Sequence, residues 1–220
     1  MRLLLAMVSA VLPQTLKRLV YNRLFGWSVH PSARIGVCLI LVDRLVVEKD
    51  VVVSHFNVIK GCELVRLEAG AGIGAFNWVS AAPRASSWFR HSPQRRPEFL
   101  MGQQSALTQR HVVDCSDTVE IGHFSVIGGM RSQVLTHAID FDRAEQRTAP
   151  VHVGAHCLVS TGCILLAGSR VPDRSLVAAG AVITPGLEEQ GVLYGGVPAR
   201  ALKVLDPDAA WFGRRRGQVL

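Results

Sequence analysis

An aliphatic residue recurs at every sixth position between residues 153 and 183. The series is Val153, Val159, Leu165, Val171, Val177 and Ile183. A small residue follows each of the first five members after four places: Cys157, Cys163, Ser169, Ser175 and Ala181. A helix has a period of about 3.6 and a strand a period of about 2, so neither explains this spacing. A parallel β-helix does, because each hexad forms one short face with its aliphatic residue inward and its small residue near the corner.

The same period runs through the first half of the chain, less regularly. It is carried by Ile35, Leu41, Val47, Val53, Ile59 and Val65, and after a change of phase by Leu67, Ile73 and Val79. Residues 80–106 show no repeat, which predicts a long loop. The repeat then resumes and includes Ile121 and Ile127, but Gln133 stands where an aliphatic residue is expected.

The end of the repeat carries a more specific pattern. Residues 178–184 read Ala-Ala-Gly-Ala-Val-Ile-Thr, and residues 195–200 read Gly-Gly-Val-Pro-Ala-Arg. Thr136 and His137 precede a polar loop that re-enters the repeat at Val153. In these features the chain resembles the hexapeptide-repeat acyltransferases, and among them the sugar O-acetyltransferases of polysaccharide biosynthesis. The resemblance is strongest from about residue 106 to residue 204, fair from 29 to 79, and absent from the first two dozen residues.

The resemblance implies an all-β fold, a left-handed parallel β-helix shaped as a triangular prism. The residue pattern before residue 28 adds a short N-terminal helical segment to it. We therefore expect the prism at residues 28–205, with loops at 80–106 and 138–150. Residues 206–220, which include Arg214, Arg215 and Arg216, form a basic C-terminal tail. Three such prisms pack side by side in the family, so the resemblance also implies a homotrimer with active sites between subunits.

Residues 1–27 are predicted to form an amphipathic helical segment. The apolar run from Leu3 to Leu12 is half the length of about twenty residues that a membrane-spanning helix needs. From Gln14 onward, Leu16, Leu19, Val20 and Leu24 fall on one helical face. Three interpretations stay open: a cap over the end of the prism, a basic helix on the inner membrane surface, or a secretory signal without an Ala-x-Ala-like cleavage site.

Composition narrows the class of partner. The formal net charge of +7 favours an anionic partner, such as a membrane lipid or the phosphates of coenzyme A. No nucleic-acid-binding motif accompanies the charge, so we expect no nucleic-acid partner. The five cysteines contain no C-x-x-C pair, and two occupy the small-residue positions of the repeat. They indicate buried, reduced thiols in a cytoplasmic protein.

His137 is the candidate catalytic base. A prism face has no room for an imidazole inside, so this side chain should project where the loop leaves the repeat. Acyl transfer from a thioester needs a base for the acceptor's proton, and imidazole has a suitable pKa. The resemblance implies this role for His137, with Asp140 as the group that orients the ring. His111 either lines the same pocket or is structural, and a loop-anchoring role for His137 is the alternative.

The resemblance also implies acetyl-CoA as co-substrate. Ala179, Gly180 and Thr184 would lie along its pantetheine arm, because small residues allow close approach to the backbone. Arg200 and Lys203 would meet its phosphates. Alternatively, the small residues only form a turn and the basic tail is solvated.

Some proteins of this fold are metal-dependent carbonic anhydrases, so the eight histidines raise a metal hypothesis. His123, His152 and His156 are the trio to consider, but their spacing does not match that pattern, and we expect no metal.

The sequence thus predicts a CoA-dependent O-acetyltransferase acting on a sugar or glycan in the cytoplasm, with contact between residues 1–27 and the inner face of the membrane as one option. Two alternatives stay open. One is a non-catalytic β-helix scaffold, because Gln133 and the run Cys157-Leu158-Val159 depart from the acetyltransferase pattern. The other is N-acylation of an amino sugar or amino acid.

Overall fold

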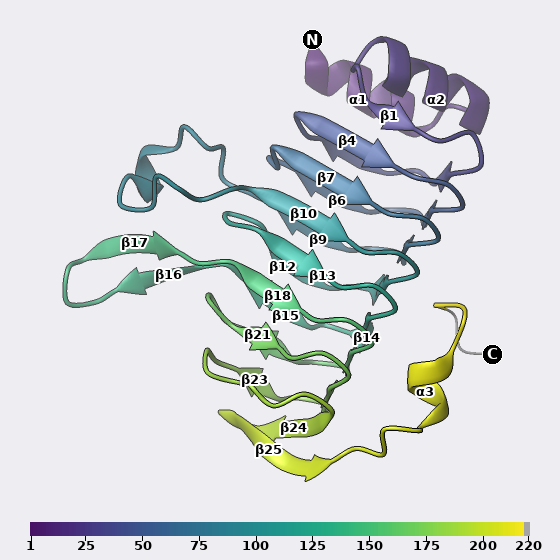
Figure 1. Cartoon of the computed structure of the whole chain (residues 1–220). Coiled ribbons are helices and arrows are strands. Elements are labelled where there is room, and N and C mark those ends of the chain that lie inside the picture. Colours follow the sequence, from purple (N-terminus) through teal and green to yellow (C-terminus); the bar gives the residue numbers. More distant parts are fainter. Residues whose placement is uncertain (218–220) are drawn as a thin grey trace.

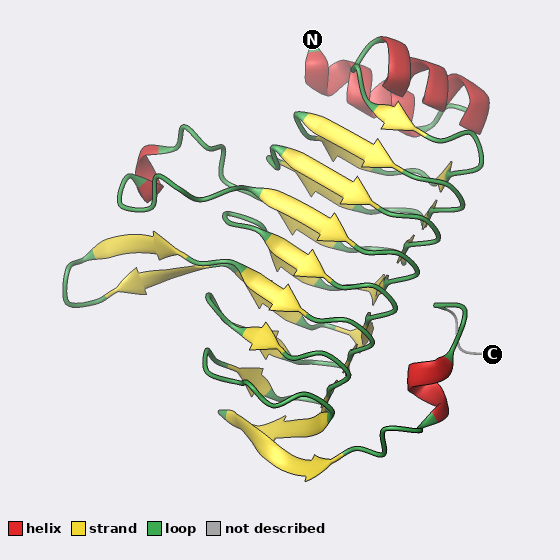
Figure 2. Cartoon of the chain, in the orientation of Figure 1, coloured by secondary structure: helices red, strands yellow, loops and turns green. Residues whose placement is uncertain are grey.

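The computed structural model describes residues 1–217, which form one parallel β-helix with helices over its N-terminal end. Short strands stack in three sheets that make three faces of a prism, and the chain passes from face A to face B to face C in each coil (Figures 1 and 2). Neighbouring strands within each face are parallel, apart from the terminal hairpin of face B.

Each face consists of strands from successive coils. Face A contains β1 (Ser28–Val29), β4 (Arg44–Val47), β7 (Leu64–Leu67), β10 (Glu98–Met101), β13 (Val119–Ile121), β18 (Val151–Val153) and β21 (Arg170–Val171). Face B contains β2 (Arg34–Ile35), β5 (Val52–Val53), β8 (Gly72–Ile73), β11 (Ala106–Gln109), β14 (Val126–Met130), β19 (Leu158–Val159), β22 (Leu176–Val177), β24 (Val192–Gly196) and β25 (Ala199–Val204). Face C contains β3 (Leu39–Leu41), β6 (Val58–Lys60), β9 (Trp78–Ser80), β12 (Val112–Asp114), β15 (Gln133–Leu135), β20 (Ile164–Leu165) and β23 (Val182–Ile183).

The core has the predicted register. The aliphatic residues of the hexads point inward and are fully buried: Val159, Leu165, Val171, Val177 and Ile183. The predicted small residues are buried at the corners: Cys157, Cys163, Ser169, Ser175 and Ala181. A narrow interior fills with one aliphatic layer per coil. The side chains where the backbone bends are mostly short, although Asn57, Asn77 and His111 are also buried at this position.

The prediction is wrong by one residue at Gln133. Gln133 is exposed, and Val134 fills the core position. The repeat that ends at Val134 is one residue longer than a hexad, and the added residue lies at the preceding corner, where Gly129 has a φ of +71°. A Cβ at Gly129 would lie 2.4 Å from the Cβ of Thr161, so this turn requires glycine.

The long loop is shorter than predicted. Residues 98–101 form β10, with Phe99 and Met101 buried in the core and paired with β7 and β13. The loop therefore covers residues 81–97 and contains the short 3₁₀ helix η1 (Ser87–Phe89). The predicted loop at 138–150 is largely an antiparallel hairpin, β16 (His137–Asp140) with β17 (Glu145–Thr148). Both excursions leave the corner between faces C and A, on the left of Figure 1.

Residues 1–27 form two helices, α1 (Arg2–Ala10) and α2 (Gln14–Arg23), which cap the first coil. Of the face predicted from the spacing of Leu16, Leu19, Val20 and Leu24, Val20 packs against the core and the three leucines are turned away from it. Lys17 is buried, and Leu16, Leu19 and Leu24 are exposed. Within residues 1–217 no helix has the length and apolar character needed to cross a membrane.

The C-terminal segment turns back along the corner between faces A and B and includes α3 (Ala210–Gly213) (Figure 1). Trp211 Nε1 donates to the carbonyl of His156 at 2.8 Å, and Arg174 donates to the carbonyl of Pro207 at 2.6 Å. Part of the predicted basic tail is therefore packed on the prism and not solvated. Its last three residues, 218–220, lie outside the described residues.

Candidate active site

Two neighbouring coils bring a histidine and an aspartate together at the corner between faces C and A. Strands β12 and β15 are parallel, with Asp114 opposite Leu135, and His137 follows two residues later. Nδ1 of His137 lies 2.8 Å from Oδ2 of Asp114. The pair thus depends on the stacking of two coils and not on nearness in sequence.

Asp114 is held in place by further donors. Its Oδ1 accepts hydrogen bonds from the backbone N–H (3.2 Å) and the hydroxyl (2.6 Å) of Ser116. Its Oδ2 accepts from the backbone N–H (3.0 Å) and the hydroxyl (2.7 Å) of Thr136. Burial alone would raise the pKa of Asp114, but the hydrogen bonds from His137, Ser116 and Thr136 outweigh it and lower the pKa. The group is therefore a fixed carboxylate near neutral pH.

His137 is oriented by this carboxylate. The hydrogen bond to Asp114 raises the pKa of His137, and partial burial opposes that shift. An ionised carboxylate can only accept, so Nδ1 carries the proton, and the neutral ring has its acceptor lone pair on Nε2. The side chain is 42% exposed, and Nε2 has no hydrogen-bond partner among residues 1–217. A histidine held in this way can take a proton from a bound molecule at Nε2.

Phe89 of the loop at residues 81–97 packs against the histidine. Its ring centroid lies 5.8 Å from that of His137 in an edge-to-face arrangement. The guanidinium of Arg95 lies 4.8 Å from the centre of the Phe89 ring. Arg95 is almost fully buried and donates to the carbonyls of Ala82, Pro83 and Ser116. One buried cation thus fixes the loop that carries Phe89.

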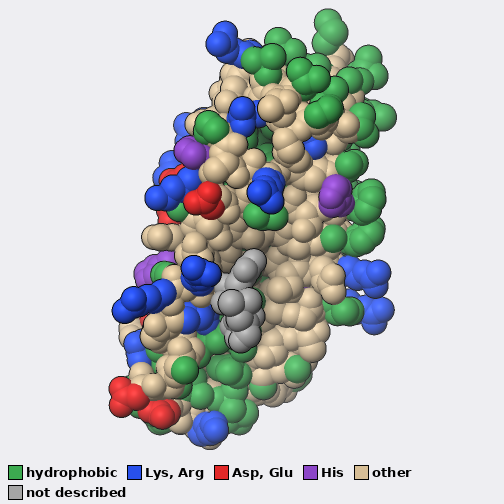
Figure 3. Space-filling view, turned by 90° about the vertical axis from the view of Figure 1, so that its right-hand side faces the viewer, with side chains coloured by type: hydrophobic (Ala, Val, Ile, Leu, Met, Phe, Trp, Pro, Cys, Tyr) green, Lys and Arg blue, Asp and Glu red, His purple; other side chains and the backbone are tan. Residues whose placement is uncertain are grey.

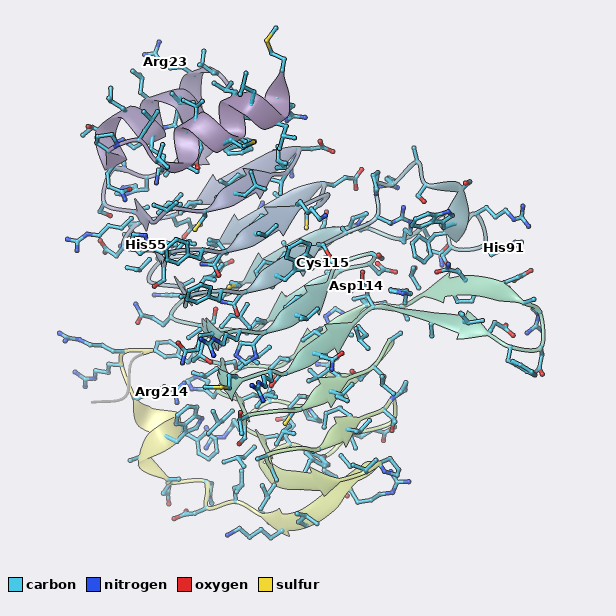
Figure 4. All side chains as sticks on the ribbon, turned by 180° about the vertical axis from the view of Figure 1, so that it is seen from behind. Arg23, His55, His91, Asp114, Cys115 and Arg214 are labelled. Atoms are coloured by element: carbon cyan, nitrogen blue, oxygen red, sulfur yellow. The ribbon has the colours of Figure 1, made fainter. Side chains whose placement is uncertain are left out.

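The hairpin β16–β17 joins the same loop. Arg147 donates to the carbonyl of His91 at 3.0 Å, and the Ser92 hydroxyl accepts from the N–H of Thr148 at 3.1 Å. Figure 4 shows His91 beside the hairpin and Asp114 at its base. The two excursions therefore form one wall beside His137.

Asp140 does not contact His137, although it was expected to orient the His137 ring. Its carboxylate binds Arg143 three residues on, at 3.0 Å, within the exposed hairpin. The residue that orients His137 is Asp114, which the sequence did not single out. Three hexads counted back from Leu135 reach Asp117, whereas the register partner is Asp114, 21 positions earlier, so the repeat alone does not identify it.

His111 does not line this site. It lies before β12, at the opposite end of the strand from Asp114, and its side chain is buried. Nε2 is 2.9 Å from the hydroxyl of Thr108, and Nδ1 accepts from the N–H of Ser132. Burial lowers the pKa of His111 to about 4. The residue stands two places before the inward Val113, which is the small-residue position of its coil, so its role is structural.

The predicted CoA residues are spread over three places. Thr184 follows β23 at the corner of His137, two strands further along face C. Ala179 and Gly180 form the turn at the other end of β23, between faces B and C. Arg200 and Lys203 lie on the terminal strand β25. Within one protomer these residues do not form a single pocket.

A groove of about 890 Å³ runs along face B. Small residues such as Gly72, Gly74 and Ala106 form part of its floor, and Trp211 and Arg216 of the C-terminal segment border it. Face B is the face opposite the corner of His137, so a ligand there is remote from His137 of the same protomer.

The histidines proposed as an alternative metal trio do not converge. His123 and His156 have ring centroids 5.3 Å apart, whereas His152 lies on face A with Nδ1 3.1 Å from Glu120. Across residues 1–217, no three His, Cys, Asp or Glu side chains form a group able to hold a metal ion.

No family model matches the chain, and no curated protein matches it in sequence. Solved structures do match it. The polysialic acid O-acetyltransferase OatWY aligns with a TM-score of 0.61 at 10% identity, over 81% of this chain and 84% of that one. A hexapeptide-repeat acetyltransferase from Vibrio cholerae aligns with a TM-score of 0.45 at 22% identity, over 49% of this chain and 68% of that one.

A mutant of AntD, an N-acyltransferase from Bacillus cereus bound to a dTDP-sugar and coenzyme A, aligns with a TM-score of 0.48 at 14% identity. That alignment covers 91% of this chain and 92% of AntD. At these identities the likeness concerns the fold. The chain has the left-handed parallel β-helix fold of the hexapeptide-repeat acetyltransferases.

Proposed function

We propose that this protein is an acyltransferase that moves an acetyl group from acetyl-CoA to a hydroxyl of a sugar or glycan, in the synthesis of a bacterial surface or exopolysaccharide. The observation that carries the proposal is the pair of His137 and Asp114, with Nε2 of the histidine open beside a wall of two loops. A β-helix that served only as a scaffold would not require a partly buried carboxylate to orient an exposed imidazole.

The chemistry follows from this geometry. Nε2 of His137 removes the hydroxyl proton as the acceptor oxygen attacks the thioester carbonyl. The carbon–sulfur bond then breaks, and the CoA sulfur leaves with the proton held by the imidazolium. Asp114 keeps the ring in one tautomer and stabilises the imidazolium while it exists. The acceptor oxygen thereby gains the acetyl group, and CoA leaves as the free thiol.

We keep Ala179, Gly180 and Thr184 as proposed contacts of the pantetheine arm, and Arg200 and Lys203 as proposed contacts of the phosphates. Thr184 is favoured by its place at the corner of His137. The separation of the others within one protomer suits a site that two protomers complete.

The proposed assembly is a trimer with cyclic symmetry. Face C has apolar side chains on its outer surface, with Trp78 and Val112 nearly half exposed. At the adjoining corner, Phe56 and Phe76 are exposed and stacked 5.1 Å apart. Packing face C of one protomer against face B of the next covers these side chains and brings the groove of face B toward a neighbouring His137.

The proposed setting is the cytoplasm, where acetyl-CoA is available. The N-terminal helices are the part of the chain that can touch the inner face of the membrane.

Release of free thiol from acetyl-CoA tests the function directly. Purified protein is incubated with acetyl-CoA and a panel of neutral, acidic and amino sugars, both free and as nucleotide sugars or oligosaccharides. The proposal expects acceptor-dependent thiol release with at least one hydroxyl acceptor and an ester product labile to hydroxylamine. An amide product on an amino sugar would make the protein an N-acyltransferase. No turnover with any acceptor, in protein that still binds CoA, would favour a scaffold.

A further inference from the structure

The N-terminal helices expose an unusual amount of apolar surface. Nine large hydrophobic side chains within the first 24 residues are half exposed or more, and we call them the apolar crown: Met1, Leu3, Leu4, Met7, Val8, Val11, Leu16, Leu19 and Leu24. Hydrophobic side chains gather over these helices at the top of the molecule in Figure 3. A contiguous surface of this kind on a water-soluble domain indicates an interaction site.

The crown faces outward because the prism needs the polar side of α2. Among the described residues, β1, β2 and β3 are the edge strands of the three sheets at this end, so their outer backbone groups need other partners. Gln14 donates to the carbonyl of Ile35 at 2.7 Å and accepts from its N–H at 3.1 Å. The ammonium of Lys17 donates to the carbonyls of Ile35 and Gly36 at 2.9 and 2.7 Å.

Asn22 binds the backbone groups at the edge of β1 in the same way. Its side chain accepts from the N–H of Val29 at 2.9 Å and donates to the carbonyl of that residue at 3.2 Å. With the polar side of the helix used in this way, the apolar side has no surface of the prism to cover. The exposure of the crown is thus tied to the capping of the strands.

The two helices carry basic side chains and no acidic one, because residues 1–42 contain no aspartate or glutamate. Lys17 is buried against the prism, and Arg2 pairs with the exposed Asp43 at 3.5 Å. This leaves Arg18 and Arg23 as the basic residues of the helices without an acidic partner among the described residues. Arg23 is exposed and stands on the outer side of the helices in Figure 4. Exposed leucines flanked by arginines match a bilayer interface with anionic headgroups, because apolar chains enter the acyl region while cations stay among the headgroups.

We infer that the apolar crown docks on an anionic lipid bilayer, with the axis of the prism pointing away from the membrane. The docking itself does not depend on the chemistry proposed for His137, although its use rests on that proposed function. In a trimer with cyclic symmetry, all three crowns face the same side, so three weak contacts act together.

This orientation limits which part of a membrane-attached acceptor can reach His137. Asp114 ends the fourth strand of face C and His137 follows the fifth, three to four strand spacings from β3. At about 4.8 Å per spacing this is roughly 15–20 Å, to which the helices add about 10 Å. A glycan attached to a membrane lipid can span that distance, and its distal sugars are then the residues that His137 can reach.

Co-sedimentation with vesicles tests the docking. The full chain is mixed with vesicles of phosphatidylcholine alone, or with about one third phosphatidylglycerol. The crown variant is Leu4→Ser with Leu19→Ser, and the matched control is Leu202→Ser with Val204→Ser, two apolar residues at the other end of the prism that are also more than half exposed. We expect the wild type and the control to bind the anionic vesicles, and the crown variant to bind them about tenfold less. Arg23→Gln should lower binding to the anionic vesicles by about fivefold, without a matching loss on phosphatidylcholine.

Three results would overturn the inference. They are a wild type that stays in the supernatant with both vesicles, a crown variant that binds like the wild type, and equal binding to both lipid compositions. A doubling of particle mass in solution that the crown variant abolishes, without vesicle binding, would assign the crown to a second copy of the chain. Thiol release with a water-soluble acceptor should be the same for the crown variant and the wild type, so the vesicle result and the catalytic result can fail separately.

Discussion

At the scale of single residues, the site depends on how Asp114 changes the orientation, tautomer and pKa of His137. The carboxylate is mostly shielded and takes five hydrogen bonds, from His137, Ser116 and Thr136. It fixes the tautomer and raises the pKa of the imidazole. The two effects oppose each other in catalysis, because a correctly oriented base is useful only in its neutral form.

The pH dependence of turnover should show this. His137 is active when neutral, so the rate should rise with pH and level off above its pKa. The pKa is raised by Asp114, so the midpoint should lie above the ordinary value of about 6.5. A midpoint at or below that value would mean that the pair does not control the rate.

Asp114→Asn should separate orientation from basicity. Asparagine keeps the shape but has no charge, so we expect turnover at the plateau to fall about ten- to a hundredfold and the midpoint to move to lower pH. Steady-state rates across pH measure both effects, and a circular dichroism melt checks folding. Asp140→Asn is the matched control and should leave the midpoint unchanged, because Asp140 binds Arg143 and not His137.

At the scale of elements, the loop at residues 81–97 depends on Arg95. Removing the guanidinium leaves the carbonyls of Ala82, Pro83 and Ser116 without their donor and Phe89 without its cation. Arg95→Ala should destabilise the loop by about 1–3 kcal/mol and raise the KM for the acceptor more than that for acetyl-CoA. Limited proteolysis and separate KM values measure this.

Arg96→Ala is the control for that variant, because the exposed guanidinium of Arg96 binds only Glu98 among side chains of residues 1–217. Equal behaviour of the two variants would show that the loop does not need the buried cation.

The sequence predicted the strands and their inward residues better than it predicted which residues of neighbouring coils lie side by side. The strict period of six determines the inward residues, since a narrow prism admits one aliphatic layer per coil. The corner at Gly129 shifts the register by one, and without its structure Asp114 cannot be aligned with Leu135. The position of His137 where the chain leaves the repeat could be predicted from the sequence, whereas the residue that orients its ring, Asp114, is a neighbour only through the stacking of coils.

The sequence also could not show which face of α2 packs against the prism. Helical periodicity shows that Leu16, Leu19 and Leu24 share a face, but not which face the prism requires. That choice is made by the unpaired groups of Val29 and Ile35, which need hydrogen bonds and not apolar contacts.

At the scale of the whole molecule, the aliphatic layers should control folding. Val171 is fully buried, so Val171→Asp places an unpaired charge in the core at a cost of several kcal/mol and should abolish soluble folded protein. Arg170→Asp alters the adjacent outward position and should leave the melting temperature within a few degrees. Soluble yield and thermal melts of the two variants compare them. If both fold equally well, the inward register is wrong.

The assembly should depend on face C. Trp78→Glu places a charge on the apolar outer surface of that face, so it should convert a trimer into monomers and reduce turnover with it. Light scattering gives the mass, and Leu202→Glu on the terminal strand is the control that should stay trimeric. A wild-type monomer with full turnover would exclude a site shared between protomers.

The most direct test of the account is the turnover of His137→Ala on a confirmed acceptor. The imidazole lies outside the prism core, so the variant should fold, assemble and bind CoA like the wild type. Without the base, thiol release should fall by about two to four orders of magnitude, and His137→Asn should be nearly as slow. A variant that keeps more than about a tenth of the wild-type turnover would contradict the assignment of the base to His137.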